Sequence, residues 1–212
     1  MAEACQKYDV ERLLFASSTS VYGDAKGLSM VDEESPLNPL SLYARTKMMS
    51  EQYLLAKYRG KGLPVCCLRV ATNYGPSRRM RFDLVVNKFA YMARWFGRIT
   101  VYGGKQWRPF IHTHDTARAY ELFLRLPLAL IKGEVYNVSN TAGNYRIIDL
   151  AELVKELVPG TKIEIKEEVK DPRSYRVSFR KIEKKTGFKT EKNVRTGLLE
   201  VLEFLKFLNQ DY

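Results

Sequence analysis

The chain has 212 residues, 45% of them hydrophobic, so it is long and apolar enough to bury a core and is not a disordered protein. Its 35 basic and 24 acidic residues give a formal net charge of +11, which favours anionic partners: phosphorylated metabolites, nucleic acid or a membrane surface. Three cysteines without metal-ligand spacing argue against a disulfide framework, and no apolar run is long enough to span a membrane. We therefore expect a soluble, cytoplasmic protein without a membrane partner.

Short apolar runs alternate with amphipathic stretches along the chain, a pattern typical of an α/β protein. In chain order, we expect a strand at 12–17, a helix at 43–57, a strand at 65–70, a helix at 84–96, a strand at 99–102, a helix at 113–126, a strand at 134–139, a helix at 147–157, a strand at 162–166 and a helix at 196–208. The stretches 23–41 and 71–82 are rich in Gly, Pro, Ser and Asn and are expected to be loops, which in α/β proteins often hold ligands.

The first ten residues have the pattern of the last turns of a helix that leads into the first strand. A domain rarely begins with such an element, because its apolar face needs earlier elements to pack against. We therefore expect that the front of a larger fold is absent from this chain.

Two segments carry residues with chemical potential. Tyr43 and Lys47 are four residues apart on one face of the helix expected there, and an ammonium near a phenol favours the phenolate, which can act as a base. Alone, a pair at this spacing is more often a packed ring beside a solvated charge. Residues 17–23 place several hydroxyl side chains at the end of the first strand, where an isolated segment would be interpreted as a self-capping turn.

Four segments in a fixed order resemble the extended short-chain dehydrogenase/reductase family, specifically its NAD-dependent nucleotide-sugar epimerases and dehydratases. Residues 17–23 resemble the serine motif of this family, residues 43–47 its Tyr-x-x-x-Lys motif, residues 68–76 its next motif, and residues 103–115 the segment that closes over the sugar nucleotide. The resemblance covers essentially the whole chain.

The resemblance implies an α/β fold that is the C-terminal part of a Rossmann-type parallel sheet with a smaller α/β substrate-binding lobe. Residues 1–75 would form the partial Rossmann-type domain. Residues 76–212 would form mainly the lobe, with about 113–140 returning to the sheet.

The resemblance also implies roles for individual residues. Tyr43 would take the sugar hydroxyl proton as hydride leaves for the nicotinamide, Lys47 would tune Tyr43 and bind the nicotinamide ribose, and Ser18 would bind the same sugar oxygen. Ser17 would join Tyr43 and Lys47 in binding the cofactor, which is NAD, with NADP not excluded. The expected substrate-binding residues are Ser18, Thr19, Thr72, Asn73, Arg108 and Tyr175. Arg108 would pair with the diphosphate, which suits its fork of donors.

The chain departs from the family pattern in three places. The substrate-binding Asn of the third motif falls at Thr72, so either Thr72 or the following Asn73 would supply the contact. A late family arginine falls at Glu168, for which Lys170 or Arg173 would have to compensate. No G-x-G-x-x-G or G-x-x-G-x-x-G turn for a dinucleotide pyrophosphate occurs, so cofactor affinity would be poor unless a separate chain supplies the missing N-terminal half.

The serine motif bears on the reaction. Family dehydratases and decarboxylases carry an acidic residue there, whereas Thr19 and Ser20 follow Ser18. This difference favours an epimerase, which oxidises C4, rotates the ketosugar and returns the hydride. Two alternatives stay open: a dehydratase or reductase, and an inactive fragment that binds a sugar nucleotide or a complementary chain. The resemblance also implies a homodimer through the helix that carries Tyr43 and the helix before it, of which this chain has only residues 1–10.

The segment 76–118 is strongly basic and contains interleaved aromatic residues, which raises a nucleic-acid-binding module as a further alternative. The aromatic residues recur at helical spacing, so most are expected in the core and this alternative is the least favoured. His112 and His114 with a single nearby Asp do not make a metal site, and none is expected; His112 should pack or hydrogen-bond locally.

Overall fold

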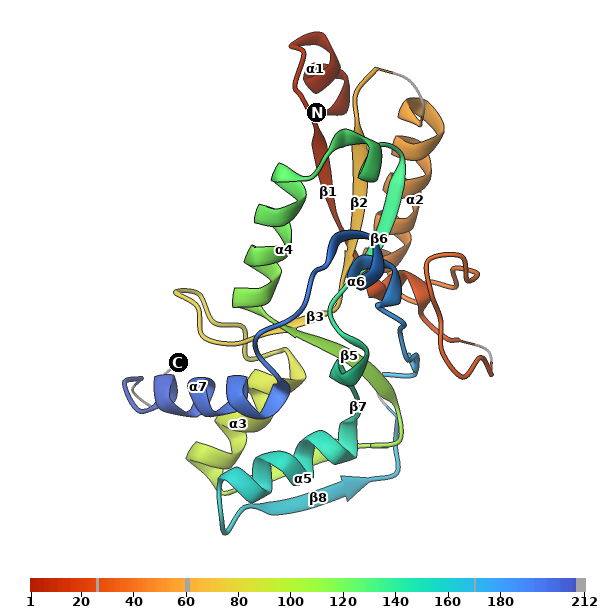
Figure 1. Ribbon diagram of the computed structural model, residues 1–212. Coiled ribbons are helices and arrows are strands. Elements are labelled where there is room, and N and C mark those ends of the chain that lie inside the picture. The colour runs from red at the N-terminus through yellow and green to blue at the C-terminus, as the bar shows by residue number, and fades with distance from the viewer. Residues whose placement is uncertain (26, 60–61, 170, 209–212) are drawn as a thin grey trace.

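A computed structural model gives the fold and describes residues 1–25, 27–59, 62–169 and 171–208. The chain forms a parallel sheet with helices on both faces, and a lobe of shorter strands and helices lies beyond one end of this sheet (Figure 1). The short N-terminal helix α1 (Ala2–Lys7) lies at the far end of the sheet from the lobe, whereas the last helix, α7 (Val194–Leu205), lies in the lobe (Figure 1).

The first sheet contains β1 (Leu13–Ser18), β2 (Val65–Val70) and β6 (Glu134–Val138), all parallel and in the order β1-β2-β6. Helix α2 (Leu42–Tyr58) packs on one face and helix α4 (Thr113–Arg125) on the other. Every residue of β2 is buried, because alternate side chains enter the two cores on either side of the sheet.

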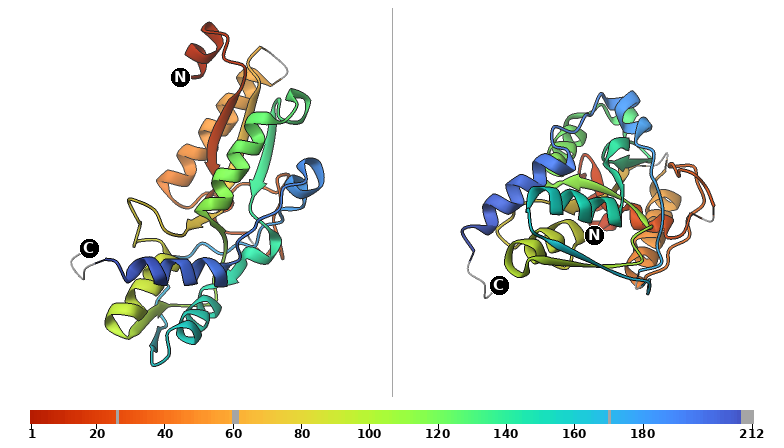
Figure 2. Two further views of the ribbon diagram at one scale, coloured as in Figure 1. Left: turned by 60° about the vertical axis from the view of Figure 1, so that its left-hand side comes forward. Right: turned by 90° about the horizontal axis from the view of Figure 1, so that it is seen from below.

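The lobe is built on two small sheets. In one, β3 (Thr72–Tyr74) runs parallel to β5 (Trp107–His112), which runs antiparallel to β7 (Asn144–Arg146). In the other, β4 (Arg98–Tyr102) pairs parallel with β8 (Lys162–Lys166). Three helices share one hydrophobic core with these strands, and α7 lies across the lobe against α3 (Figure 2): α3 (Val85–Phe96), α5 (Ile147–Leu157) and α7 (Val194–Leu205).

The chain crosses between the two parts several times. Helix α4 and strand β6 return to the first sheet, and the short helix α6 (Arg180–Thr186) packs beside β6. In the described part of the chain, three short 3-10 helices fill connections between strands and helices: η1 (Thr19–Tyr22), η2 (Leu128–Leu130) and η3 (Thr141–Gly143). The segment 23–41 bridges to the segment 174–177 through Asp24–Ser174 and Val31–Val177.

Two serine caps mark the end of β1 and the beginning of α2. Ser41 is extended, and its side chain accepts a hydrogen bond from the Ala44 N–H, which caps α2 two residues before Tyr43. Ser18 ends β1 and caps η1 by accepting from the Ser20 N–H. The chain therefore turns sharply after β1, and residues from both segments reach the same end of the sheet.

The α/β class expected from the sequence is confirmed, and each predicted strand and helix is present with bounds that shift by a few residues at most. The predicted loop 71–82 is wrong in part, because it contains β3. Strands β5 and β7 were not predicted from apolar runs; β5 carries Arg108, Pro109 and His112, and its strand character comes from pairing with distant segments. Among the described residues, no helix is long and apolar enough to cross a bilayer.

Candidate functional site

A cavity of about 980 Å³ opens between the first sheet and the lobe. Its walls come from the carboxyl ends of β1 and β2, the first turn of α2, and segments of β3, β5 and α3, which is where parallel α/β sheets usually bind ligands. The described lining includes four basic and two acidic side chains: Arg81, Lys88, Arg108, Arg173, Asp83 and Asp171. This excess of positive charge suits an anionic ligand.

Ser18 and Tyr43 line this cavity together, although 25 residues of sequence separate them. Tyr43 is 55% exposed, in keeping with a side chain that faces an open cavity. The Lys47 ammonium lies 5.6 Å from the centre of the Tyr43 ring and donates to the Ala16 carbonyl at 2.6 Å, so it stands behind Tyr43 at the end of β1. The helical spacing thus brings the expected catalytic groups to one place.

Ser17 also borders the cavity, but its hydroxyl donates to the Glu51 carboxylate and the residue is 4% exposed. Thr72 and Asn73 of β3 both line the cavity. The Asn73 side-chain oxygen accepts a hydrogen bond from the Thr116 hydroxyl at 2.5 Å, which fixes its orientation.

Arg108 enters the cavity from β5 and is held by a carboxylate. Its guanidinium pairs with Asp171 at 3.0 Å and donates to the Trp107 and Arg173 carbonyls. Asp171 also binds the Arg173 side chain with contacts of 2.6 and 2.8 Å. Burial opposes ionisation of Asp171, but hydrogen bonds from Arg173 and the charge of Arg108 outweigh it and hold the pKa of Asp171 well below its ordinary value.

Thr19 and Tyr175 do not appear among the residues that line the cavity. Tyr175 is 3% exposed; its ring lies 5.4 Å from the Arg108 guanidinium carbon, and its hydroxyl is hydrogen-bonded to Thr19. Burial raises the pKa of Tyr175, so the ring supports Arg108 from behind as a neutral aromatic side chain.

Residues 1–139 match the sequence profile of the NAD dependent epimerase/dehydratase family. The match spans the serine segment, the Tyr43–Lys47 pair and Arg108. The chain belongs to this family. The expected assignment to a family of NAD-dependent epimerases and dehydratases is therefore confirmed.

Similar proteins include both kinds of family member. The uncharacterized UDP-glucose epimerase YtcB of Bacillus subtilis is 29% identical over 158 residues, which are 74% of this chain and 48% of the relative. The solved UDP-glucose 4-epimerase with UDP-glucose from Thermotoga maritima is 26% identical, with a TM-score of 0.84 over 96% of this chain and 66% of that chain. The solved dTDP-glucose 4,6-dehydratase from Bacillus anthracis in complex with NAD is 25% identical, with a TM-score of 0.83 over 96% of this chain and 64% of that chain.

These structures confirm the expected Rossmann-type α/β fold. The chain spans about half the length of the B. subtilis relative (48%) and about two thirds of the two solved chains (66% and 64%).

Several residues that line the cavity of this chain were not predicted from the sequence. Arg81 and Asp83 form a bidentate pair at the rim, and Lys88 reaches the cavity from the first turn of α3. The basic segment 76–118 signalled positive charge without showing which side chains face inward. Asp171 gave no signal, because it is one charge in a charged stretch. Of the residues expected to compensate for Glu168, Arg173 lines the cavity and Lys170 lies outside the described residues.

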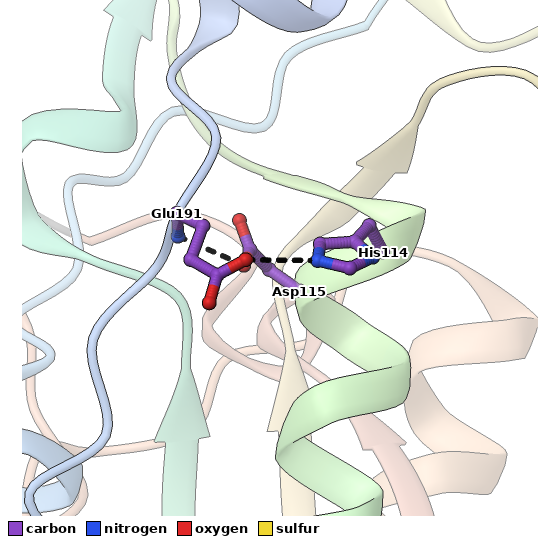
Figure 3. A group of neighbouring side chains, drawn as sticks. All are labelled: His114, Asp115 and Glu191. Atoms are coloured by element: carbon purple, nitrogen blue, oxygen red, sulfur yellow. Dashed lines mark hydrogen bonds and ion pairs between the residues drawn. The ribbon is translucent and has the colours of Figure 1, made fainter.

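His114, Asp115 and Glu191 form a cluster at the start of α4, and their ligand atoms lie within 4.8 Å of one another (Figure 3). The Asp115 carboxylate is fully buried and accepts from the backbone N–H groups of Glu191 and Lys192 at 2.9 and 3.0 Å. Arg118 pairs with both carboxylates. Because donors already occupy these oxygens, the cluster locks residues 191–192 onto α4 and offers a poor cation site.

His112 has the local role that the sequence predicted. Its Nδ1 accepts a hydrogen bond from the His114 N–H at 3.2 Å and so caps α4. Its ring packs edge-on against Tyr74, with 5.3 Å between ring centres.

Proposed function

We propose that this chain binds a nucleoside-diphosphate sugar in the cavity and forms the sugar-nucleotide part of an NAD-dependent epimerase. The observation that carries the proposal is that the hydroxyl groups of Ser18 and Tyr43 and the guanidinium of Arg108 line one cavity. Such a cavity offers partners both to a reacting sugar and to its diphosphate. The UDP-glucose and NAD named for the similar solved structures agree with this ligand class.

The Tyr43 side of the cavity fits the nicotinamide-ribose end of NAD. Lys47 has three N–H donors, one of which binds the Ala16 carbonyl, so it has donors to offer a ribose hydroxyl. Bound NAD would accept a hydride and later return it. No glycine-rich turn for the pyrophosphate occurs in this sequence, so the partners proposed here are those for the nicotinamide-ribose end of the cofactor.

The chain's own residues would move one proton and hold the substrate. Tyr43 accepts the proton of the sugar C4 hydroxyl as that carbon is oxidised and returns it when the carbonyl is reduced again. Ser18 hydrogen-bonds the same oxygen, which limits its movement. Arg108 and Arg173 hold the diphosphate, leaving the sugar free to rotate between the two hydride transfers.

The carboxylates of the cavity favour an epimerase over a dehydratase. Dehydration needs an acid or base besides Tyr43 to remove water. Among the described residues that line the cavity, the two carboxylates are Asp83 and Asp171, and both are paired with arginines. The residues after Ser18 are Thr19 and Ser20, which offer no carboxylate.

The test is product analysis after incubation of the chain with UDP-glucose and millimolar NAD. An epimerase gives UDP-galactose, of the same mass as its substrate, whereas a dehydratase gives a product that has lost one water. We expect Tyr43→Phe to lower turnover by at least about 100-fold, because it removes the proton acceptor. Tyr53→Phe is the matched control: Tyr53 is on the same helix but bonds to Glu3 and Lys57, so turnover should stay unchanged. Binding of UDP-glucose without turnover would support the inactive fragment instead.

A further inference from the structure

A buried ion pair joins α2 to the strand ends beside the cavity, and the chemistry proposed above does not use it. The side chains of Glu51 and Arg69 are 2% and 5% exposed, and Arg69 Nη2 meets Glu51 Oε2 at 2.7 Å. Arg69 Nε lies 3.1 Å from both carboxylate oxygens. Since desolvation of two charges largely offsets their attraction, a buried pair is weak evidence for a role in stability, and its position calls for another explanation.

Glu51 binds neighbouring positions of two strands. Ser17 of β1 and Arg69 of β2 lie opposite each other in the parallel register. The Ser17 hydroxyl donates to Glu51 Oε1, and Arg69 binds both oxygens of the same carboxylate. One side chain of α2 therefore fixes this helix against the ends of both strands, one residue before Ser18.

Glu51 also shares a helical face with Tyr43 and Lys47, at steps of four residues. Lys47, on the same face of α2, donates a hydrogen bond to the carbonyl of Ala16 in β1. A helix is stiff and rises about 12 Å over eight residues, so a rotation or slide at Glu51 is carried to Tyr43. Ser18 belongs to β1, the strand to which Glu51 is hydrogen-bonded through Ser17, so the same movement changes the position of Tyr43 relative to Ser18.

Arg69 also makes a hydrogen bond on the side away from Glu51. Its Nη1 donates to the Tyr22 hydroxyl at 3.0 Å, and that hydroxyl donates to Asn137 Oδ1 at 2.8 Å. Tyr22 belongs to η1, which follows Ser18, and Asn137 belongs to β6; both are fully buried. Arg69 thus holds the turn after Ser18 while Glu51 holds the strand before it.

We propose that Glu51 is a positioning residue: through Ser17 and Arg69 it sets the placement of Tyr43 relative to Ser18. It therefore governs the rate of proton transfer more than the affinity for the sugar nucleotide. The inference rests on the proposed function for the identity of the reacting groups.

The experiment compares Glu51→Gln with the double variant Glu51→Met/Arg69→Met in protein labelled with 3-fluorotyrosine. The fluorine resonance of Tyr43 is assigned by its loss in Tyr43→Phe. Glu51→Gln leaves the Arg69 charge buried without its counter-ion, so the melting temperature falls. The double variant removes both charges, so stability recovers while the link to Ser17 stays broken. A positioning role predicts a shifted or split Tyr43 resonance in both variants, and kcat for UDP-glucose lower by about tenfold or more with KM within about twofold.

Recovery of the Tyr43 resonance together with the melting temperature in the double variant would overturn the proposal, because the pair would then be purely structural. Ser17→Ala gives a milder test, since it removes one hydroxyl and leaves the ion pair; an unchanged Tyr43 resonance there also counts against the proposal. Asp115→Asn is the matched control, a buried carboxylate that binds an arginine away from α2, and should destabilise the protein without moving the resonance. If the wild-type chain lacks turnover, the proposed function fails, and the fluorine signal still decides this inference.

Discussion

At the scale of single residues, the cavity is shaped by charges that are already paired. Asp171 lies between Arg108 and Arg173 and leaves this corner of the cavity with one net positive charge. A carboxylate in this position orients both guanidinium groups before a ligand arrives. It also makes the stability of the protein depend on the ionisation of Asp171.

We predict that Asp171→Asn lowers the free energy of unfolding at pH 7 by about 0.5 kcal/mol, a small value because the Asp171 side chain is 46% exposed and its ion pairs are screened by solvent. The folded-state pKa of Asp171 is depressed, so its contribution is complete above the unfolded pKa of about 3.9 and is lost as the pH falls further. The difference between wild type and variant should therefore shrink below about pH 4. Urea unfolding at pH 7, 4 and 3 measures it, with the more exposed Asp83→Asn as control. A difference that grows at low pH would contradict the assigned ionisation.

The sequence predicted Ser18, Tyr43 and Lys47 because their spacing and order form a motif, and the structure brings them together. Asp171 could not be predicted, since its place in the cavity depends on contact with Arg108 from a distant strand. The burial of Tyr175 and the contact of its ring with Arg108 likewise depend on distant segments, whereas its expected role at the sugar came from the family resemblance and stays a prediction.

At the scale of elements, α7 approaches β3 and β5 so closely that a glycine is needed in its first turns. A Cβ at Gly197 would lie 2.5 Å from Tyr74 Cε2 and 2.8 Å from His112 Cδ2, and both of these side chains are buried. Helix propensity alone favours alanine over glycine by about 1 kcal/mol. We predict the opposite sign here: Gly197→Ala should lower the free energy of unfolding by about 1–3 kcal/mol, as overpacking does.

Urea unfolding measures this prediction. Leu199→Ala, two residues further along α7 at a site that is 49% exposed, is the control and should change stability by less than about 0.5 kcal/mol. If Gly197→Ala is as stable as wild type, α7 can move away from Tyr74 without cost and the close packing is not a constraint.

The long elements were predictable because their apolar periodicity is local: β2 is a buried run throughout, and α5 has the bounds that its sequence indicated. Strands β3 and β7 are only three residues long, and their pairing with β5 joins segments far apart in the chain. No window of sequence contains that information. The sequence therefore predicted some residues of the cavity, such as Ser18, Tyr43 and Arg108, but not its shape, which depends on β3 and β5.

At the scale of the whole molecule, the chain offers more binding groups to the proposed sugar nucleotide than to NAD. Arg108 and Arg173 both line the cavity and form the proposed site for the diphosphate of a sugar nucleotide. For NAD, the chain offers the Tyr43–Lys47 end, whereas no glycine-rich turn is present in its sequence to let backbone N–H groups approach the pyrophosphate. The two ligands should therefore bind with different strength to the same polypeptide.

We predict that the 212-residue chain binds UDP at least about tenfold more tightly than NAD in isothermal titration calorimetry, since charge-assisted bonds to the diphosphate are among the strongest the cavity offers. Arg108→Gln should weaken UDP binding and leave NAD binding unchanged, because Arg108 belongs to the proposed diphosphate site and not to the Tyr43–Lys47 pair proposed to bind the nicotinamide ribose. Lys47→Ala should leave UDP binding unchanged. Micromolar NAD binding that weakens in Lys47→Ala would contradict the prediction and show that the Tyr43–Lys47 end of the site is sufficient to hold the cofactor.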